Sequence, residues 1–329
     1  MNNPSIFIGP MSKNVVDSVI QYSNNTGNAI GLIPSRRQIE YNQGYVNGWT
    51  TGQFAKYVRE RSSNVLLQRD HGGRLQSSSA DSMMSYEADA LSGFDLIHID
   101  PWKQFVDIDE IISETVRNIL FCESRNPDCG YEIGTEEAIH KYSCEELDYF
   151  LSGVKNSLGR GWSKVKYAVI QSGTAISATS NVGVFDEQRC ERMIDVCRNY
   201  GLKSKEHNGD YLTSGEMKQR FDLGLDAINI APQFGVSETR QVLEAAHGDN
   251  NLFERIFRLC YNSKKWVKWF PSDFTVSTKE DKRKLIEVSC HYIFSSPEFV
   301  EIFEKLKIQN TDLIRNHIDY IGLLHEGIK

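Results

Sequence analysis

The 329-residue sequence lacks the features of several classes of protein. Positive charge is not in excess, because 44 acidic residues outnumber 37 lysines and arginines and give a formal net charge of -7. Nucleic acids and anionic membranes reward clustered Lys and Arg, so neither is expected as a partner. No apolar run approaches the roughly 18–20 residues of a membrane span. A phosphorylated small molecule is not excluded, because a few local cations or amide donors can bind it.

Cysteine pairs are also missing. The seven cysteines are scattered, odd in number and without a Cys-x-x-Cys pair, which is typical of reduced thiols. The segment Met1–Pro10 has neither the basic region nor the long apolar run of a signal peptide. We therefore expect a cytoplasmic protein.

From residue 5 to about 247, short apolar runs alternate with amphipathic helical stretches. The predicted strands are Ser5–Gly9, Ala29–Ile33, Asn64–Arg69, Leu96–Asp100, Tyr131–Gly134, Lys166–Gln171, Leu202–Glu206 and Ala227–Ile230. The helices predicted between and after them are Val15–Tyr22, Thr51–Arg61, Ala80–Leu91, Ile108–Cys122, Cys144–Ser157, Glu187–Tyr200, Ser214–Leu223 and Glu238–His247. Eight such pairs predict an α/β fold of the (β/α)8 TIM-barrel type. A doubly wound open sheet is the alternative, but no Gly-x-Gly-x-x-Gly turn follows the first strand.

Beyond residue 250 the pattern becomes helical, with no strand signal. We therefore expect a barrel at residues 1–249 and a helical C-terminal extension at residues 250–329. Aromatic residues are dense in the extension, where we expect them to pack against the barrel wall. A contact between subunits is the alternative.

The active site of a barrel of this type lies at the C-terminal ends of its strands, and here those ends are rich in polar residues. Asp70 and His71 end the third strand, and the following Gly72-Gly73 lets the chain turn. One side chain could then bind a metal while the other transfers a proton. The alternative is an Asp that caps the next helix beside a purely structural His. The other candidates are Ser35, Arg36, Gln38, Asp100, Glu132, Glu136, Gln171, His207 and Asn229.

Several of these candidates also have structural explanations. Glu132 could be a buried charge paired with Arg36 or Arg37, because an unpaired buried carboxylate is costly. His207 could be a satisfied loop histidine, and Asn229 could bind loop backbone groups. The loop after the last strand, from Ile230 to Gly235, precedes a predicted helix N-terminus and is the expected phosphate site.

Taken in order, the strand ends resemble the class II fructose- and tagatose-bisphosphate aldolases. The matching segments are Asp70-His71-Gly72, Glu132-Ile133-Gly134, Gly173-Thr174-Ala175-Ile176, His207-Asn208-Gly209 and Asn229-Ile230-Ala231. The tagatose-bisphosphate aldolase accessory subunit resembles the chain more closely, over Ser35–Phe54, Gly93–Asp100, Tyr131–Glu136 and Glu206–Tyr211. The resemblance covers roughly residues 10–245.

The resemblance implies an enzyme of carbohydrate metabolism that acts on a phosphorylated ketose by metal-assisted aldol or retro-aldol chemistry. A divalent metal, expected to be Zn²⁺, would bind His71 and His207. The family's third histidine falls on Ile176, which cannot bind a metal, so a carboxylate from Glu132, Glu136 or Asp100 is needed, and we assign Glu136. Asp70 and Glu132 are then the expected catalytic residues. The expected substrate-binding residues are Ser35, Arg36, Gln38, Asp100, Gln171 and Asn229.

Two other functions stay open. One is a ketose or ketose-phosphate epimerase that uses the same chemistry. The other is a non-catalytic subunit that stabilises a partner aldolase, which Ile176 favours and the retained polar residues disfavour. The expected partners are a small sugar phosphate and either further copies of the chain or an aldolase subunit.

Overall fold

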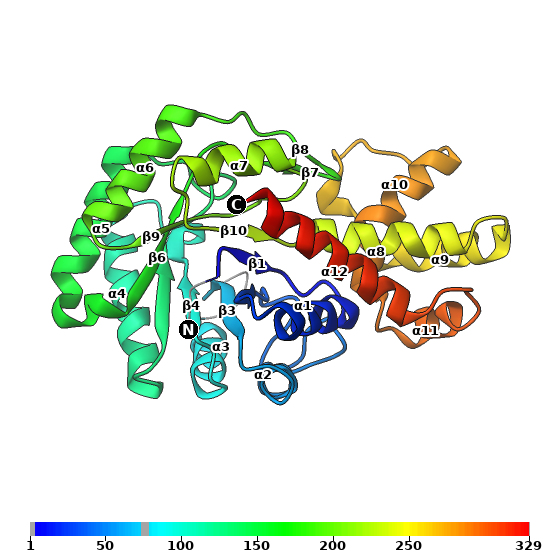
Figure 1. The fold of residues 1–329 in the computed structure, drawn as a ribbon, viewed down its shortest axis with the longest axis horizontal. Helices are drawn as coiled ribbons and strands as arrows, with labels where there is room; N and C mark the ends of the chain where they lie inside the picture. Colours follow the sequence, from blue (N-terminus) through cyan, green and yellow to red (C-terminus); the bar gives the residue numbers. More distant parts are fainter. Residues whose placement is uncertain (1–3, 74–78, 329) are drawn as a thin grey trace.

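Eight parallel strands close into a barrel in the computed structural model, which describes residues 4–73 and 79–328 (Figure 1). The strands are β1 (Ile6–Ile8), β2 (Ile30–Leu32), β3 (Val65–Gly72), β4 (Leu96–Ile99), β5 (Gly130–Ile133), β6 (Val165–Ile170), β9 (Lys203–Glu206) and β10 (Ala227–Ile230). Their order around the barrel is β1-β10-β9-β6-β5-β4-β3-β2. The predicted (β/α)8 TIM barrel is therefore confirmed.

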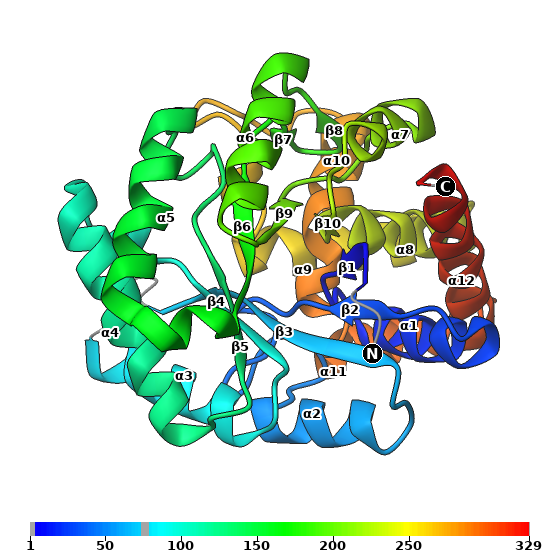
Figure 2. The ribbon, with the colours of Figure 1, turned by 60° about the vertical axis from the view of Figure 1, so that its left-hand side comes forward.

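Helices surround the strands, as Figure 2 shows. They are α1 (Lys13–Thr26), α2 (Thr51–Arg59), α3 (Ser79–Leu91), α4 (Ile108–Arg125), α5 (Cys144–Leu158), α6 (Glu187–Asn199), α7 (Ser214–Asp222) and α8 (Pro232–Ala245). Capping boxes begin three of them, at Thr50, Ser143 and Thr213. The helix predicted at Glu238–His247 begins earlier, because Pro232 takes the first helical position, which suits its fixed φ. The sequence analysis also missed a hairpin of β7 (Ile176–Ser177) and β8 (Ser180–Asn181).

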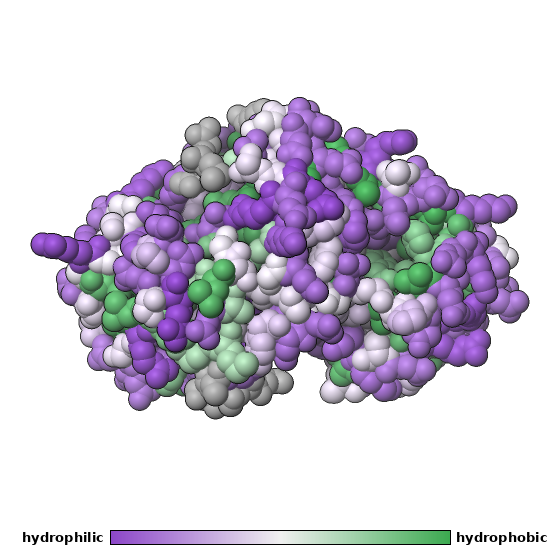
Figure 3. All heavy atoms as spheres, turned by 90° about the horizontal axis from the view of Figure 1, so that it is seen from below, coloured by the Kyte–Doolittle hydropathy of each residue, from purple (hydrophilic) through white to green (hydrophobic). Residues whose placement is uncertain are grey.

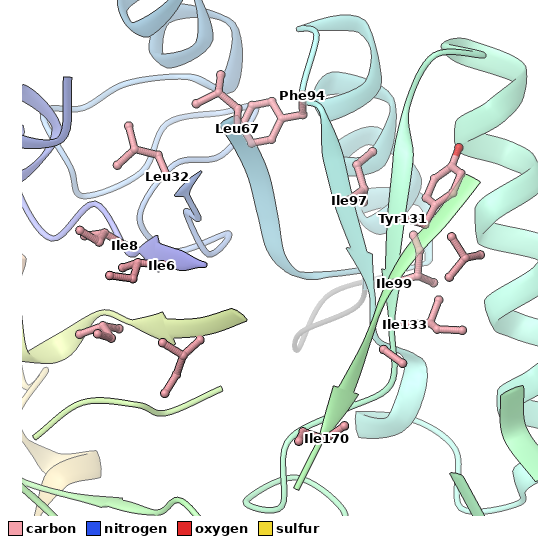
Figure 4. Close-up of a cluster of buried hydrophobic side chains, with 14 of the residues drawn as sticks. Ile6, Ile8, Leu32, Leu67, Phe94, Ile97, Ile99, Tyr131, Ile133 and Ile170 are labelled. Carbon is pink, nitrogen blue, oxygen red and sulfur yellow. The ribbon is translucent and has the colours of Figure 1, made fainter. Parts of the chain in front are cut away.

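Aliphatic side chains from the strands form the main core together with the inner faces of the helices. Figure 4 shows part of it, with Ile97 and Ile99 of β4 beside Tyr131 and Ile133 of β5. These side chains are fully buried, and burying each aliphatic one stabilises the fold by about 1.5–3 kcal/mol. The core therefore fixes the strand ends, and with them the positions of the polar side chains that follow.

All regular elements from Asn250 onwards are helical, namely α9 (Asn250–Ser263), η3 (Val267–Trp269), α10 (Lys279–Ser289), η4 (Cys290–Ile293), α11 (Pro297–Phe303) and α12 (Asn310–Gly327). Helices α9, α10 and α11 extend to one side of the barrel in Figure 1, and α12 returns to pack on α1. The aromatic residues of the extension form a second core with Val242 and Leu243 of α8. The expected packing against the barrel is therefore made mainly through α8.

The surface and the helices agree with the lack of a long apolar run in the sequence. Hydrophilic residues cover most of the face seen in Figure 3, with smaller hydrophobic patches between them. No helix among the described residues is long and apolar enough to cross a membrane. All seven cysteines are buried free thiols.

Candidate active site

A cavity of about 370 Å³ lies where the strand ends meet the C-terminal extension. Most of the predicted site residues line it, namely Ser35, Arg36, Gln38, Asp70, His71, Glu136, His207 and Asn229. The extension contributes Lys268, Trp269 and Tyr292. Side chains from distant parts of the sequence thus converge at the end of the barrel where the resemblance predicts a site.

A local irregularity in β3 turns Asp70 and His71 toward the same cavity. Adjacent residues of a regular strand point to opposite faces. Here the register between β3 and β4 shifts between Arg69 and Gly72, and His71 has a left-handed φ of 44°. The chain therefore turns at His71 itself, one residue before the predicted turn at Gly72-Gly73.

Each of the two cavity histidines is held by a buried carboxylate through one ring nitrogen. Nδ1 of His71 lies 2.6 Å from an oxygen of Asp100, and Nε2 of His207 lies 2.8 Å from an oxygen of Glu132. The side chains of Asp100 and Glu132 are fully buried. A carboxylate that accepts the proton of one imidazole nitrogen leaves the other nitrogen free to bind a metal.

The free nitrogens of both histidines face the same two carboxylate oxygens. Nε2 of His71 lies 3.3 Å from Oε2 of Glu136 and 3.7 Å from Oδ1 of Asp70. Nδ1 of His207 lies 3.6 Å and 3.8 Å from the same two oxygens. Ligands about 2.1 Å from a tetrahedral zinc ion stand about 3.4 Å apart, close to these spacings. Oδ1 of Asp70 is also buried without a hydrogen-bond partner. The four side chains therefore fit a divalent cation.

The pKa values of the two histidines also favour a cation at this site. Burial lowers the pKa of His207, but Glu132, Glu136 and Asp70 raise it to about 9. Burial lowers the pKa of His71 too, yet the carboxylates around it, with Asp70 first among them, raise it well above its ordinary value. Both shifts favour the protonated form of the two histidines when no cation is present. A divalent cation competes with these protons, so we expect metal binding to release protons.

His98 lies directly beside this cluster. One ligand atom each from Asp70, His71, His98 and His207 lie within 4.8 Å of one another. Both nitrogens of His98 are already used, however: Nδ1 accepts from the backbone N–H of His71, so Nε2 donates to the carbonyl of Gly134. His98 thus supports the turn at His71 and the loop that carries Glu136.

The structure corrects the predicted catalytic role of Glu132. Its carboxylate is fully buried and is bonded to Nζ of Lys205 at 2.9 Å, to Nε2 of Gln68 at 2.8 Å and to His207. The predicted alternative partners, Arg36 and Arg37, do not contact it, because Arg36 pairs with Glu40 and Asp81. Glu132 is therefore a positioning residue for His207.

Two predicted substrate contacts are corrected as well. The side chain of Asp100 is fully buried and faces His71, and it does not line the cavity. The amide of Gln171 donates to the carbonyls of Thr135 and His140 and accepts from Tyr142, so it holds a loop. Asn229 does line the cavity, and its buried Oδ1 has no hydrogen-bond partner, so it is free for a ligand.

Four charged residues near the site were not predicted from the sequence. Lys205 is buried inside the barrel against the ring of Phe7, and nothing in a polar strand marks which lysine faces inward. Asp210 lines the cavity and caps α8. It lies within Glu206–Tyr211, one of the segments of the resemblance, but no role was predicted for it. Lys103 and Lys268 line the cavity from outside the matched strand ends.

Comparison with known proteins supports the fold. No model of a known protein family matches the chain, and no curated protein matches its sequence. The structure of a probable tagatose 6 phosphate kinase from Sinorhizobium meliloti 1021 superposes with a TM-score of 0.75 and 17% identity, covering 99% of this chain and 91% of that chain. The fructuronate-tagaturonate epimerase UxaE from Cohnella laeviribosi gives 0.68 and 12%, covering 99% and 81%.

The YdjI aldolase from Escherichia coli K12 gives a TM-score of 0.59 and 10% identity, covering 98% of this chain and 91% of that chain. At such low identities the likeness concerns the fold. It confirms that the barrel fold of this chain is shared with the probable kinase and the YdjI aldolase.

Proposed function

We propose that this chain is a divalent-metal-dependent enzyme that breaks or forms a carbon–carbon bond in a phosphorylated ketose by aldol chemistry. One observation carries the proposal: two histidines, each held by a buried carboxylate, aim their free nitrogens at Glu136 and Asp70 in one cavity. The aldolase and sugar epimerase among the similar structures support a ketose as substrate.

His71, His207 and Glu136 would hold the cation, which would supply a Lewis acid for the ketose carbonyl. Asp70 is partly exposed at the cavity wall, with 22% of its side chain accessible, and can accept the proton of the hydroxyl two carbons from that carbonyl. Loss of this proton lets the carbon–carbon bond break, and its electron pair passes toward the polarised carbonyl. Asn229 can bind a substrate hydroxyl through its unpartnered Oδ1.

Glu136 can take the third ligand position, which Ile176 cannot fill. Ile176 lines the cavity from the β7–β8 hairpin and offers no ligand atom. Glu136 lies within 3.6 Å of both histidine nitrogens and supplies a third ligand from a different strand end. This geometry favours an enzyme over a non-catalytic subunit.

A ketose epimerase is the second candidate. Retro-aldol cleavage followed by re-addition to the other carbonyl face inverts one centre, and the same residues can carry out both steps. The epimerase fold matches this chain with a higher TM-score than the YdjI aldolase does, 0.68 against 0.59. The products separate the two activities, because an aldolase releases two fragments and an epimerase returns one isomeric ketose.

The test combines metal analysis with a panel of ketose phosphates. We expect the purified chain to bind a divalent metal and to convert at least one of these compounds. His71→Ala should lower metal affinity and activity together, by at least the ~10–100-fold typical of losing even a ligand's supporting contact. His291→Phe is the matched control, because it replaces a buried histidine in another cavity. Full activity after thorough chelation would contradict the proposal.

A further inference from the structure

A carboxylate from a neighbouring loop already binds the segment Ile230 to Gly235, where a phosphate is expected. A helix N-terminus binds phosphate through free backbone N–H groups. At the start of α8, however, Oδ1 of Asp210 accepts the N–H of Ala231 at 3.0 Å and that of Gln233 at 2.7 Å. Pro232 has no N–H, and the N–H of Phe234 bonds to the carbonyl of Ala231.

The backbone donors of Ala231, Gln233 and Phe234 at this end of the cavity are therefore already used. In the neighbouring loop, the N–H of Gly209 bonds to the carbonyl of Asn229 and that of Tyr211 to the side chain of Gln233. Asp210 is only 1% exposed and lines the cavity, so its carboxyl group stands where the phosphate would bind. These contacts disfavour the phosphate site expected between Ile230 and Gly235.

Cations gather on another part of the cavity wall. Arg37 follows β2, Lys103 ends η1 (Pro101–Lys103) after β4, and Lys268 lies in η3 of the extension. All three line the cavity, and none pairs with a carboxylate among the described residues. Asp210 follows β9. In the closed barrel β9 is the third strand from β2 in one direction and the third from β4 in the other, so Asp210 lies across the barrel from the loops that carry Arg37 and Lys103.

Two further observations show that these cations form one group. Burial, together with the positive charges of Arg37 and Lys103, lowers the pKa of Lys268 to about 8, as expected for three cations on one cavity wall. Trp269, next to Lys268, also lines the cavity, so its indole lies beside the three cations. Clustered cations are the groups that bind an oxyanion.

We infer that the cavity takes a ketose with a single oxyanion terminus, which Arg37, Lys103 and Lys268 bind, while the other terminus is neutral and lies beside Asp210. The inference rests on the proposed function and narrows its substrate from ketose phosphates in general to those with one charged end. A bisphosphate would place its second dianion against the carboxyl group of Asp210, which already uses the N–H groups of Ala231 and Gln233. Burial raises the pKa of Asp210 to about 7, so this repulsion is strongest above that pH.

Binding is measured by calorimetry on the full chain in the presence of Zn²⁺. The probes are a ketohexose, its 6-phosphate, its 1,6-bisphosphate and a keto-hexuronate. The wild-type chain should bind the 6-phosphate roughly tenfold or more tightly than the neutral sugar, as a charge-assisted contact predicts. It should bind the bisphosphate no more tightly than the 6-phosphate.

Three variants locate the two ends of the ligand. Lys268→Gln should weaken binding of the 6-phosphate by roughly tenfold and leave the neutral sugar unchanged. Lys265→Gln is the matched control, because Lys265 lies nearby in the sequence but does not line this cavity. Asp210→Asn keeps an oxygen that accepts from the α8 amides and should improve binding of the bisphosphate relative to the 6-phosphate.

The outcomes separate this inference from the proposed function, because turnover is recorded independently of binding. Equal effects of Lys268→Gln and Lys265→Gln, or a wild-type preference for the bisphosphate, would overturn the inference whatever is turned over. The expected binding pattern with no turnover supports the inference and overturns the proposed enzyme activity. If the chain binds the hexuronate but none of the phosphates, and this binding depends on Lys268, the single oxyanion end is supported. The phosphate group of the proposed substrate is then overturned.

Discussion

Two buried histidines in neighbouring cavities differ in a way that explains where the chemistry lies. His207 lines the cavity of about 370 Å³ at the barrel mouth, and His291 of η4 lines a larger one of about 650 Å³ between the barrel and the extension. Both are almost fully buried, at 3% and 1% exposure. Carboxylates face both nitrogens of His207, whereas neither nitrogen of His291 has a partner.

The difference lies in the carboxylates and not in cavity size or burial. Burial lowers the pKa of both rings, but the carboxylates raise that of His207 to about 9. The pKa of His291 falls to about 3, because Lys268 adds to the effect of burial. Glu238 and Glu304 line the larger cavity, but the carboxylate of Glu238 is already bonded to Ser12 and His317, and no carboxylate contacts His291. Of the two cavities, the one at the barrel mouth is therefore the better cation site.

The largest expected effect comes from removing the charge that holds His207. Glu132→Gln leaves the buried ammonium of Lys205 without its counter-ion, and breaking a buried pair in this way typically costs about 3–5 kcal/mol. We expect a loss of this size in the free energy of unfolding, measured by urea denaturation. Asp222→Asn is the control, because its exposed pair with Lys218 should contribute less than about 1 kcal/mol. Equal losses in the two variants would show that Glu132 does not hold the site together.

The sequence predicted the barrel well because apolar runs carry the strand signal. All eight strands lie within a few residues of their predicted positions, and even the polar β9 was found. The site was predicted less completely, because facing partners do not show in a linear pattern. That Glu132 meets Lys205, and that Asp210 caps α8, depends on strands that pair only in the closed barrel. Lys268 joins the cavity from an extension outside the resemblance.

The second prediction concerns acid stability and tests the other histidine. His291 has a folded pKa of about 3, below the unfolded value of about 6.5, so below pH 6.5 the unfolded chain binds a proton that the folded chain does not. Stability should therefore fall as the pH decreases from about 6.5 toward 3, by at most about 1.4 kcal/mol per pH unit from this group.

His291→Phe removes this contribution and keeps an aromatic ring beside Tyr45 and Tyr292. Urea denaturation of both proteins between pH 6.5 and 4.5 should give curves that diverge, with the variant increasingly the more stable of the two. Carboxylates that titrate in this range affect both proteins alike and cancel in the difference. Parallel curves would mean that His291 has a proton acceptor in the folded chain.

The smallest expected effect concerns Ile176, which faces the same cavity as the two site histidines. Were the site short of a ligand, Ile176→His would tighten zinc binding strongly. Glu136 already lies within 3.6 Å of both free nitrogens, so we expect a gain of less than about tenfold in the otherwise unchanged protein. In a Glu136→Gln background the same histidine should restore much of the lost zinc affinity, because it then replaces the missing third ligand. Zinc titrations of the two single variants and the double variant, each with a thermal melt, measure both effects.

A large gain from Ile176→His alone would show that Glu136 is not a ligand. A lowered melt without any rescue would show that the β7–β8 hairpin needs an apolar residue at this position.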